Sequence, residues 1–221
     1  MRDGEYVSNS ESIGASASAS VAPSIGIAIV LAGGSSLRMA GEDKLAMALA
    51  DRPLLDHALG AIADVPVTVV VGPRRPTLLP VRWTREEPPG GGPVAGIAAG
   101  LAVTTADQQS SGLVAVIAGD MPFAGRELHT LAAALVAGGA DVAFAVGNDD
   151  RDQPLLAVWQ VEALAAALEP LDSVAGRSVR SLLADVVVSR VPVANAATLD
   201  CDEPGDLEHL ARVARGEPDE A

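Results

Sequence analysis

Short apolar runs alternate with amphipathic segments along most of the chain. Residues 25–31 form the first run, and residues 67–71 and 113–118 form similar runs rich in Val, Ile and Ala. Continuous apolar runs of this kind are typical of strands that are buried on both faces of a sheet. The segments between them repeat apolar residues three and four positions apart, as from Leu54 to Ile62, which predicts helices.

The alternation predicts an order of elements. Strands are expected at residues 25–31, 67–71, 80–84, 113–118, 141–146, 155–159 and 186–191, and helices beginning at Pro53 and Pro93 and at about 125–137, 161–168, 177–184 and 203–214. Strands joined by helices favour an α/β fold, a three-layer α/β/α sandwich around a mostly parallel, Rossmann-like sheet. Ligands of such sheets bind at the carboxyl ends of the strands.

Length and composition indicate one domain. The chain has 221 residues, of which 49% are hydrophobic but only 2% aromatic, so its core must consist of Ala, Val, Leu and Ile. Residues 1–22 are rich in Ser and Ala without apolar periodicity, and we expect a disordered N-terminal tail there. A globular domain is expected at residues 23–215, and a second disordered tail at residues 216–221.

Charge and hydropathy limit the partners. The net charge is −14, and no basic cluster occurs, so we expect no nucleic acid partner. No apolar stretch reaches 18 residues and no secretory signal pattern occurs, so we expect no membrane partner and a cytoplasmic location. Cys201 is the only cysteine, which excludes an intramolecular disulfide. We interpret it as an inert, small apolar residue, since Asp200 and Asp202 beside it disfavour a thiolate.

The segment that follows the first strand has the composition of a phosphate-binding loop. Gly33 and Gly34 let backbone N–H groups approach phosphate oxygens, and Arg38 and Lys44 supply positive charge. Neither the P-loop pattern nor the dinucleotide-binding glycine pattern fits this segment. An ordinary glycine turn is the alternative interpretation.

Carboxylates stand at two positions suited to a metal ion. Asp120 follows the strand at 113–118, where it either holds Mg²⁺ or caps the next helix, and Gly119 is expected to allow close approach by a substrate. Asp200 and Asp202 lie two positions apart before the last helix. Asp202 is either a second metal ligand opposite Asp120 or the N-cap of that helix.

Two further segments carry candidate anion contacts. The glycine-rich loop at residues 88–96 leads into a helix whose first N–H groups suit a base edge or a phosphate, with a flexible connection as the alternative. Arg177 and Arg180 open a later helix, where they either bind a second anion or form a solvated face.

Together these motifs resemble the nucleotidyltransferase family that includes the molybdenum cofactor guanylyltransferases. The elements that carry the resemblance are Leu31-Ala32-Gly33-Gly34, Arg38-Met39, Asp43-Lys44, Gly92-Pro93-Val94-Ala95-Gly96, Asp120-Met121-Pro122 and residues 200–207. They occur in the family's order over residues 25–210. The chain departs from the family pattern at Ala40, at Glu86-Glu87 and at Asp202, where glycine, a pair ending in Asp, and Asn are found in members.

The resemblance implies a fold of the nucleotide-diphospho-sugar transferase type and transfer of GMP from GTP to the phosphate of molybdopterin, with release of pyrophosphate. A related CTP- or other NTP-dependent transferase for molybdopterin or another small phosphorylated acceptor is the alternative. A nucleotide-binding regulator without catalysis is the alternative from another class. The implied partners include proteins that deliver the pterin and the molybdoenzymes that receive the product.

The resemblance also implies roles for single residues. Arg38, Lys44 and Asp120 would be catalytic, and Asp120 and Asp202 would bind Mg²⁺. Arg177 and Arg180 would contact the acceptor. The residues implied to bind the nucleotide are Leu31, Ala32, Gly33, Gly34, Arg38, Lys44, Glu87, Gly92, Pro93 and Gly96.

Overall fold

A seven-stranded sheet forms the centre of the computed structural model, which describes residues 23–34, 43–105 and 112–217. The order of its strands is β5-β4-β1-β6-β8-β7-β9. The strands are β1 (Ile25–Leu31), β4 (Val67–Val71), β5 (Arg82–Thr84), β6 (Leu113–Ala118), β7 (Val142–Val146), β8 (Asp152–Gln160) and β9 (Val188–Pro192). Among these described strands, only β8 runs antiparallel to its neighbours β6 and β7, which confirms the mostly parallel sheet.

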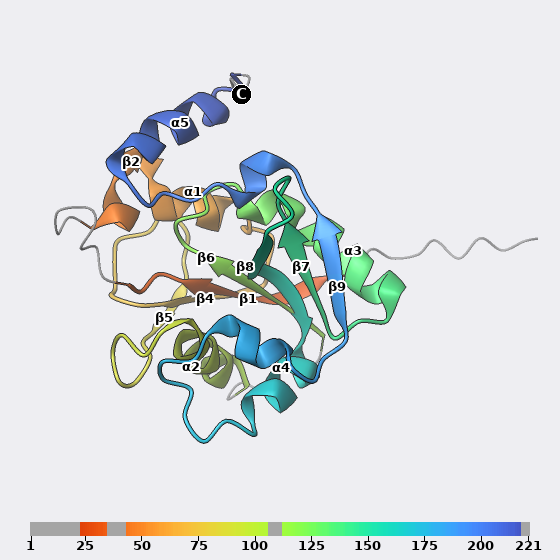
Figure 1. Ribbon diagram of the computed structural model, residues 1–221. Coiled ribbons are helices and arrows are strands. Elements are labelled where there is room, and N and C mark those ends of the chain that lie inside the picture. The colour runs from red at the N-terminus through yellow and green to blue at the C-terminus, as the bar shows by residue number, and fades with distance from the viewer. Residues whose placement is uncertain (1–22, 35–42, 106–111, 218–221) are drawn as a thin grey trace, which may run out of the picture.

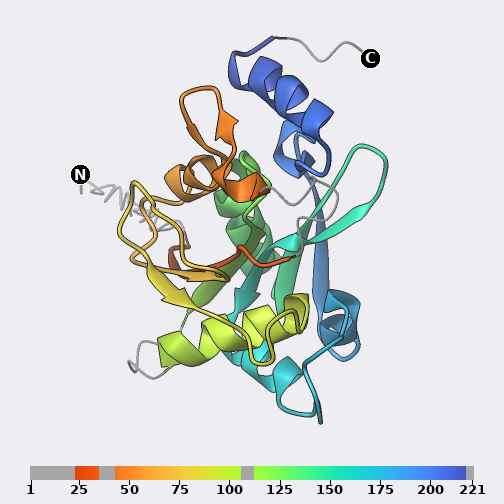
Figure 2. The ribbon, with the colours of Figure 1, turned by 90° about the vertical axis from the view of Figure 1, so that its left-hand side faces the viewer.

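Helices cover both faces of the sheet and complete the expected three-layer sandwich (Figure 1). One face packs against α1 (Leu54–Gly60) and α3 (Leu128–Gly138), and the other packs against α2 (Pro93–Thr105) and α4 (Val161–Leu168). The last helix, α5 (Pro204–Ala214), projects beyond the layer that holds α1 and α3 (Figure 2). None of the helices in the described part of the chain has the length and apolar character of a bilayer span.

The register of the central strands fixes where a site can form. Strand β1 is buried on both faces and pairs in parallel with β4 and β6. Leu31, its last residue, is opposite Val71 of β4 and Ala118 of β6. Because three parallel strands end at one level, the loops that follow them share one edge of the sheet.

Several elements differ from those expected. The helix expected at residues 177–184 is a short 3₁₀ helix, η4 (Val179–Leu183), and the helix expected at about 125–137 begins with the 3₁₀ helix η3 (Ala124–Glu127). The strand expected at residues 155–159 extends back through Pro154. Pro154 is tolerated there because β8 pairs with β6 only from Leu156 onward, so its missing N–H breaks no bond to that strand.

The segment after Asp43 contains three elements that the sequence pattern did not predict. These are the 3₁₀ helix η2 (Lys44–Ala46) and the hairpin strands β2 (Ala48–Leu49) and β3 (Arg52–Pro53). A further 3₁₀ helix, η5 (Asn195–Thr198), precedes α5. The expected N-terminal tail, most of the expected C-terminal tail and Arg38 lie outside the described residues.

Candidate functional site

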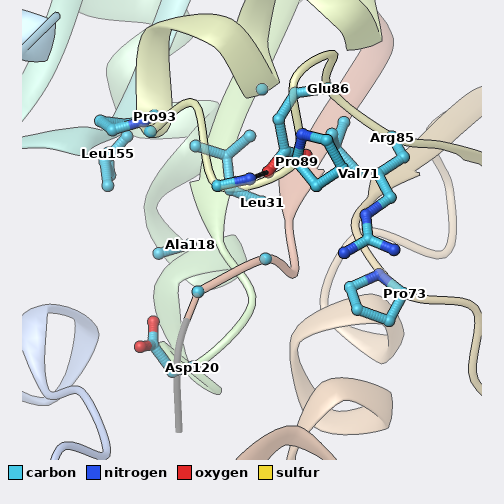
Figure 3. A pocket seen from close by; sticks show the side chains of 15 residues that line it. Leu31, Val71, Pro73, Arg85, Glu86, Pro89, Pro93, Ala118, Asp120 and Leu155 are labelled. Carbon is cyan, nitrogen blue, oxygen red and sulfur yellow. Dashed lines mark hydrogen bonds between the residues drawn. The ribbon is translucent and has the colours of Figure 1, made fainter. Parts of the chain in front are cut away.

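A cavity of about 620 Å³ lies at the edge of the sheet where β1, β4 and β6 end (Figure 3). Its position agrees with the ligand edge expected for a parallel sheet. Asp120 lies at one end of the cavity, and Glu86 and Arg85 lie at the other. The predicted nucleotide-binding residues that line it are Leu31, Gly33, Gly34, Gly92, Pro93 and Gly96.

Close approach of the backbone shapes the wall that follows β1. Ala32 donates its N–H to the carbonyl oxygen of Val71 at 2.8 Å. A Cβ on Gly72 would lie only 2.5 Å from the carbonyl oxygen of Ala32, and Gly72 has a φ of +147°. Only glycine fits between these two strand ends, so the wall depends on it.

Gly119 has a different role from the one expected. Its N–H donates to the carbonyl oxygen of Leu31 at 2.9 Å, and a Cβ there would lie 3.1 Å from the same oxygen. Gly119 is not among the cavity's lining residues. Its missing side chain therefore admits the end of β1 rather than a substrate, which corrects the expectation from the sequence.

Helix α2 directs its first turn at the cavity. Gly92, Pro93 and Gly96 line the cavity, and no acidic residue occupies the first turn of this helix. A Cβ on Gly96 would lie 3.0 Å from Cδ2 of Leu31, so the glycine lets the helix pack tightly against β1. The unpaired N–H groups and the positive end of the helix dipole favour an anionic or electron-rich ligand here.

Lys44 connects two acidic residues that are distant in the sequence. Its Nζ lies 2.5 Å from Oδ2 of Asp120 and 3.2 Å from Oδ1 of Asp202, and it donates to the carbonyl oxygen of Cys201 at 2.8 Å. Burial opposes the charge of Lys44, but its hydrogen bonds to Asp120 and Asp202 outweigh burial and raise the pKa of the ammonium. Lys44 is therefore a fixed cation beside the cavity.

Lys44 is also the only lysine in the chain. The chain has 15 lysine and arginine residues, and all of them except Lys44 are arginines. An ammonium is a compact charge, whereas a guanidinium is planar and wide. The use of lysine at this one position, and of arginine at all the others, is consistent with a site that requires the compact charge.

The carboxylates around Lys44 fit a divalent cation. Burial, and then repulsion by the charges of Asp202 and Asp120, raise the pKa of Asp200, so three carboxylates share one region. Asp120 and Asp202 reach the same nitrogen, so they lie close enough to share one ion. Mg²⁺ prefers hard oxygen ligands and retains several waters, so two carboxylates are a sufficient protein contribution. Among the described residues, no group of three or more ligand side chains is placed to hold an ion alone.

The two capping alternatives are wrong. Glu203, not Asp202, is the N-cap of α5, and it forms a reciprocal capping box with Asp206. Oδ2 of Asp206 accepts the backbone N–H groups of Asp202 and Glu203, each at 2.7 Å. Asp120 does not cap the helix that follows it, because the N-cap of η3 is Phe123 and makes no side-chain bond. Both aspartates thus leave their carboxylates available to Lys44.

Glu86 lines the cavity where Glu87 was expected. Glu86 is only 8% exposed, and its Oε1 accepts the N–H of Gly90 at 3.0 Å and lies 3.6 Å from where a Cβ of Gly33 would be. Glu87 is exposed and is not among the lining residues. The two neighbouring acids therefore lie differently, because Glu86 is held in the cavity wall by its bond from Gly90 and Glu87 lies at the surface.

Arg177 and Arg180 are not part of the cavity wall. Both are exposed, and Nε of Arg177 donates to the carbonyl oxygen of Ser173 at 3.3 Å. The loop before Arg177 contacts the cavity rim, because Gly176 donates to the carbonyl oxygen of Gly91 at 2.7 Å. Ala32 and Lys44 do not line the cavity either, but both are directly bonded to residues that do.

Comparisons with known proteins match most of the chain to one family. The family described as MobA-like NTP transferase domain matches residues 28–191. A protein of Bradyrhizobium sp. (strain ORS 278) named molybdenum cofactor guanylyltransferase is 32% identical over 207 residues, which cover 87% of this chain and 95% of that protein.

Solved structures share the fold. The molybdopterin-guanine dinucleotide biosynthesis protein A of Archaeoglobus fulgidus is 22% identical with a TM-score of 0.65, covering 86% of this chain and 99% of that one. The 2-C-methyl-D-erythritol 4-phosphate cytidylyltransferase of Thermus thermophilus is 17% identical with a TM-score of 0.55, covering 85% and 98%. Because the second protein is named for a cytidylyl transfer, the fold by itself does not select the nucleotide.

Proposed function

Since this chain belongs to the MobA-like NTP transferase family, we propose that it transfers GMP from GTP to the phosphate of molybdopterin and releases pyrophosphate. The observation that carries the proposal is a cavity lined by the family's glycine motifs that ends at Asp120, which is paired with the only lysine. The relative in Bradyrhizobium, whose name states guanylyl transfer, supports the choice of nucleotide and cofactor.

The base is proposed to bind at the end of the cavity that contains Glu86. A carboxylate accepts hydrogen bonds only, and each of its oxygens can accept more than one. Guanine offers two neighbouring donors, N1–H and the 2-amino group, whereas adenine and cytosine lack such a pair. The nearly buried carboxylate of Glu86 therefore supports guanine, and it takes the role expected for Glu87.

The phosphates are proposed to lie toward Asp120. The backbone after β1, Lys44 and Arg38 would surround them with N–H groups and positive charge. An oxygen of the acceptor phosphate forms a bond to the α-phosphorus of GTP, and the bond from that phosphorus to the bridging oxygen breaks. Pyrophosphate leaves with the electron pair of that bond.

This reaction requires little proton transfer from the protein. The acceptor phosphate is already ionised at neutral pH, so positioning and charge neutralisation provide the rate enhancement. Lys44 would stabilise the charge that develops on the α-phosphoryl group. A Mg²⁺ ion held by Asp120 and Asp202 would, when bound, offset the negative charge of the triphosphate.

The acceptor is proposed to approach from the side of Leu155 and the loop at residues 172–177. Leu155 lines the cavity, and the loop contacts Gly91 at its rim. Arg177 and Arg180 would then meet the phosphate of the pterin. We propose a cytoplasmic enzyme that receives molybdopterin from the proteins that make it and passes the dinucleotide to molybdoenzymes.

Pyrophosphate release tests this function. The purified chain is incubated with each of the four NTPs, with and without molybdopterin, in Mg²⁺ or in EDTA. Among the four NTPs, release is expected only with GTP, and only when molybdopterin and Mg²⁺ are also present. ITP, which lacks the 2-amino group, is tested as a fifth nucleotide and is expected to react more slowly than GTP. Release with CTP instead would assign the alternative transferase. Tight GTP binding without release would indicate a regulator.

A further inference from the structure

Arg75 connects the ends of two central strands to the residue that precedes Lys44. Its Nη1 donates to the carbonyl oxygens of Ala32 at 3.0 Å and of Pro73 at 2.9 Å. Its Nε donates to Oδ2 of Asp43 at 2.6 Å. Only 13% of the Arg75 side chain is exposed, and it does not line the cavity. Two of the three guanidinium nitrogens, Nε and Nη1, are therefore bonded to the protein.

Asp43 links Arg75 to the backbone at Lys44. Its second carboxylate oxygen, Oδ1, accepts the N–H of Leu45 at 3.3 Å and caps η2, the short helix that Lys44 begins. The backbone oxygen of Asp43 accepts the N–H of Ala46 at 2.9 Å. A charge-assisted bond to arginine is short and directional, so it fixes the carboxylate on which this cap depends.

We infer that Arg75 is a positioning residue that holds Lys44, through Asp43, at the place where its ammonium meets Asp120. The inference rests on the proposed function, in which Lys44 acts on the α-phosphoryl group. Lysine has a long side chain with many rotamers, so the position of its ammonium depends on a fixed backbone at the base of the side chain. Through Asp43, Arg75 fixes the backbone at Lys44 relative to β1 and β4, the strands whose ends form the cavity.

Steady-state kinetics separates positioning from simple binding. Arg75→Ala is expected to lower kcat about 10- to 100-fold, the size of effect that a small misplacement of a catalytic group produces, while KM for GTP changes less than about threefold. Arg75→Lys is expected to recover little, because an ammonium cannot make the three bonds in this geometry. Arg74→Ala is the matched control, since Arg74 is exposed and makes no such contact with the described residues.

A double-mutant cycle tests the route through Asp43. If Arg75 acts through Asp43, Asp43→Asn lowers kcat in the same direction, and the double variant is no slower than Arg75→Ala alone. Independent effects that multiply in the double variant would overturn the inference. Wild-type kcat in a folded Arg75→Ala protein would overturn it as well.

The single lysine supplies a readout that does not need activity. The amines that an acylating ester can modify are those of Lys44 and the N-terminus, and mass spectrometry of the peptide that contains Lys44 gives the rate at this side chain. Contacts with Asp120 and Cys201 protect the amine, so Arg75→Ala is expected to speed acylation several-fold, with Arg74→Ala unchanged.

The two readouts distinguish failure of the inference from failure of the proposed function. If the wild-type chain releases no pyrophosphate from any NTP, the proposed function fails, but acylation still reports whether Arg75 fixes Lys44. If acylation of Lys44 is the same in wild type and Arg75→Ala, with circular dichroism showing both folded, the inference is wrong whatever the activity.

Discussion

Two parts of the site, the cavity wall and the charged cluster around Lys44, are built in different ways. The wall formed after β1 and β4 and at the start of α2 consists of glycines and apolar side chains, held by strand register. The cluster of Lys44, Asp120 and Asp202 consists of side chains from separate segments, with Lys44 and Asp202 158 residues apart in the chain. We conclude that the wall sets shape and the cluster sets charge, so changes in the two should have different consequences.

The largest effect is expected in the charged cluster, from Asp120→Asn. The variant keeps the shape of the side chain but removes the charge that pairs with Lys44 and would hold a cation. We expect kcat for pyrophosphate release to fall by about 1,000-fold or more, with little change in the melting temperature. A variant that retained wild-type kcat would remove Asp120 from the chemistry.

The next effect is expected from Lys44→Met, which keeps the length of the side chain without its charge. A loss of about 100- to 1,000-fold in kcat is expected, as for removal of one charge-stabilising donor. Single-turnover measurements with saturating GTP would separate the chemical step from binding. If only KM rose, Lys44 would be a binding residue and not part of the catalytic centre.

A change in the backbone wall should act on stability and binding together. In Gly72→Ala the added Cβ meets the carbonyl oxygen of Ala32 at a positive φ, so we expect a loss of about 1–3 kcal/mol in the free energy of unfolding and weaker GTP binding. Urea denaturation and calorimetry measure the two effects. Gly138→Ala in α3 is the control, because a Cβ there meets nothing within 4 Å. Equal stability of the two variants would contradict the close approach of β1 and β4.

The smallest effect is expected from Cys201→Ala, which tests whether Lys44 uses only the backbone of this residue. The carbonyl oxygen that accepts from Lys44 remains in the variant, so kcat should not change.

Burial raises the pKa of the Cys201 thiol to about 11, and the residue is 0% exposed. The native thiol should therefore resist iodoacetamide at pH 8 and react only after denaturation. Rapid native alkylation would show that this part of the cluster is open.

The sequence predicted the elements whose signal is local. Continuous apolar runs marked the central strands, and the glycines after the first strand marked the cavity, because strand propensity and backbone freedom depend on neighbouring residues. The position of Asp120 at the cavity was also predicted, since this residue follows a clear strand. The interpretation of Cys201 as a small apolar residue agrees with its burial, although burial contributes more to its raised pKa than the neighbouring carboxylates do.

The features that were missed depend on tertiary contacts. Whether Glu86 or Glu87 faces the cavity depends on the path of the loop after β5, where Glu86 packs beside Gly33. The N-cap of α5 is an exception, because the capping box of Glu203 and Asp206 is a local pattern that the sequence contained and that excludes Asp202 as the cap. Arg75 gave no signal, because its partners Asp43 and Ala32 lie 32 and 43 residues away. The hairpin of β2 and β3 is too short for a pattern to appear.

A crystal structure of the chain with Mg²⁺ and a GTP analogue that resists transfer would show whether the nucleotide binds between Glu86 and Asp120. We expect guanine against Glu86 and Gly33, the α-phosphate within hydrogen-bonding distance of Lys44, and the metal ion on Asp120. A nucleotide seated with its phosphates away from Lys44 and Asp120, or with its base outside the cavity, would contradict this expectation.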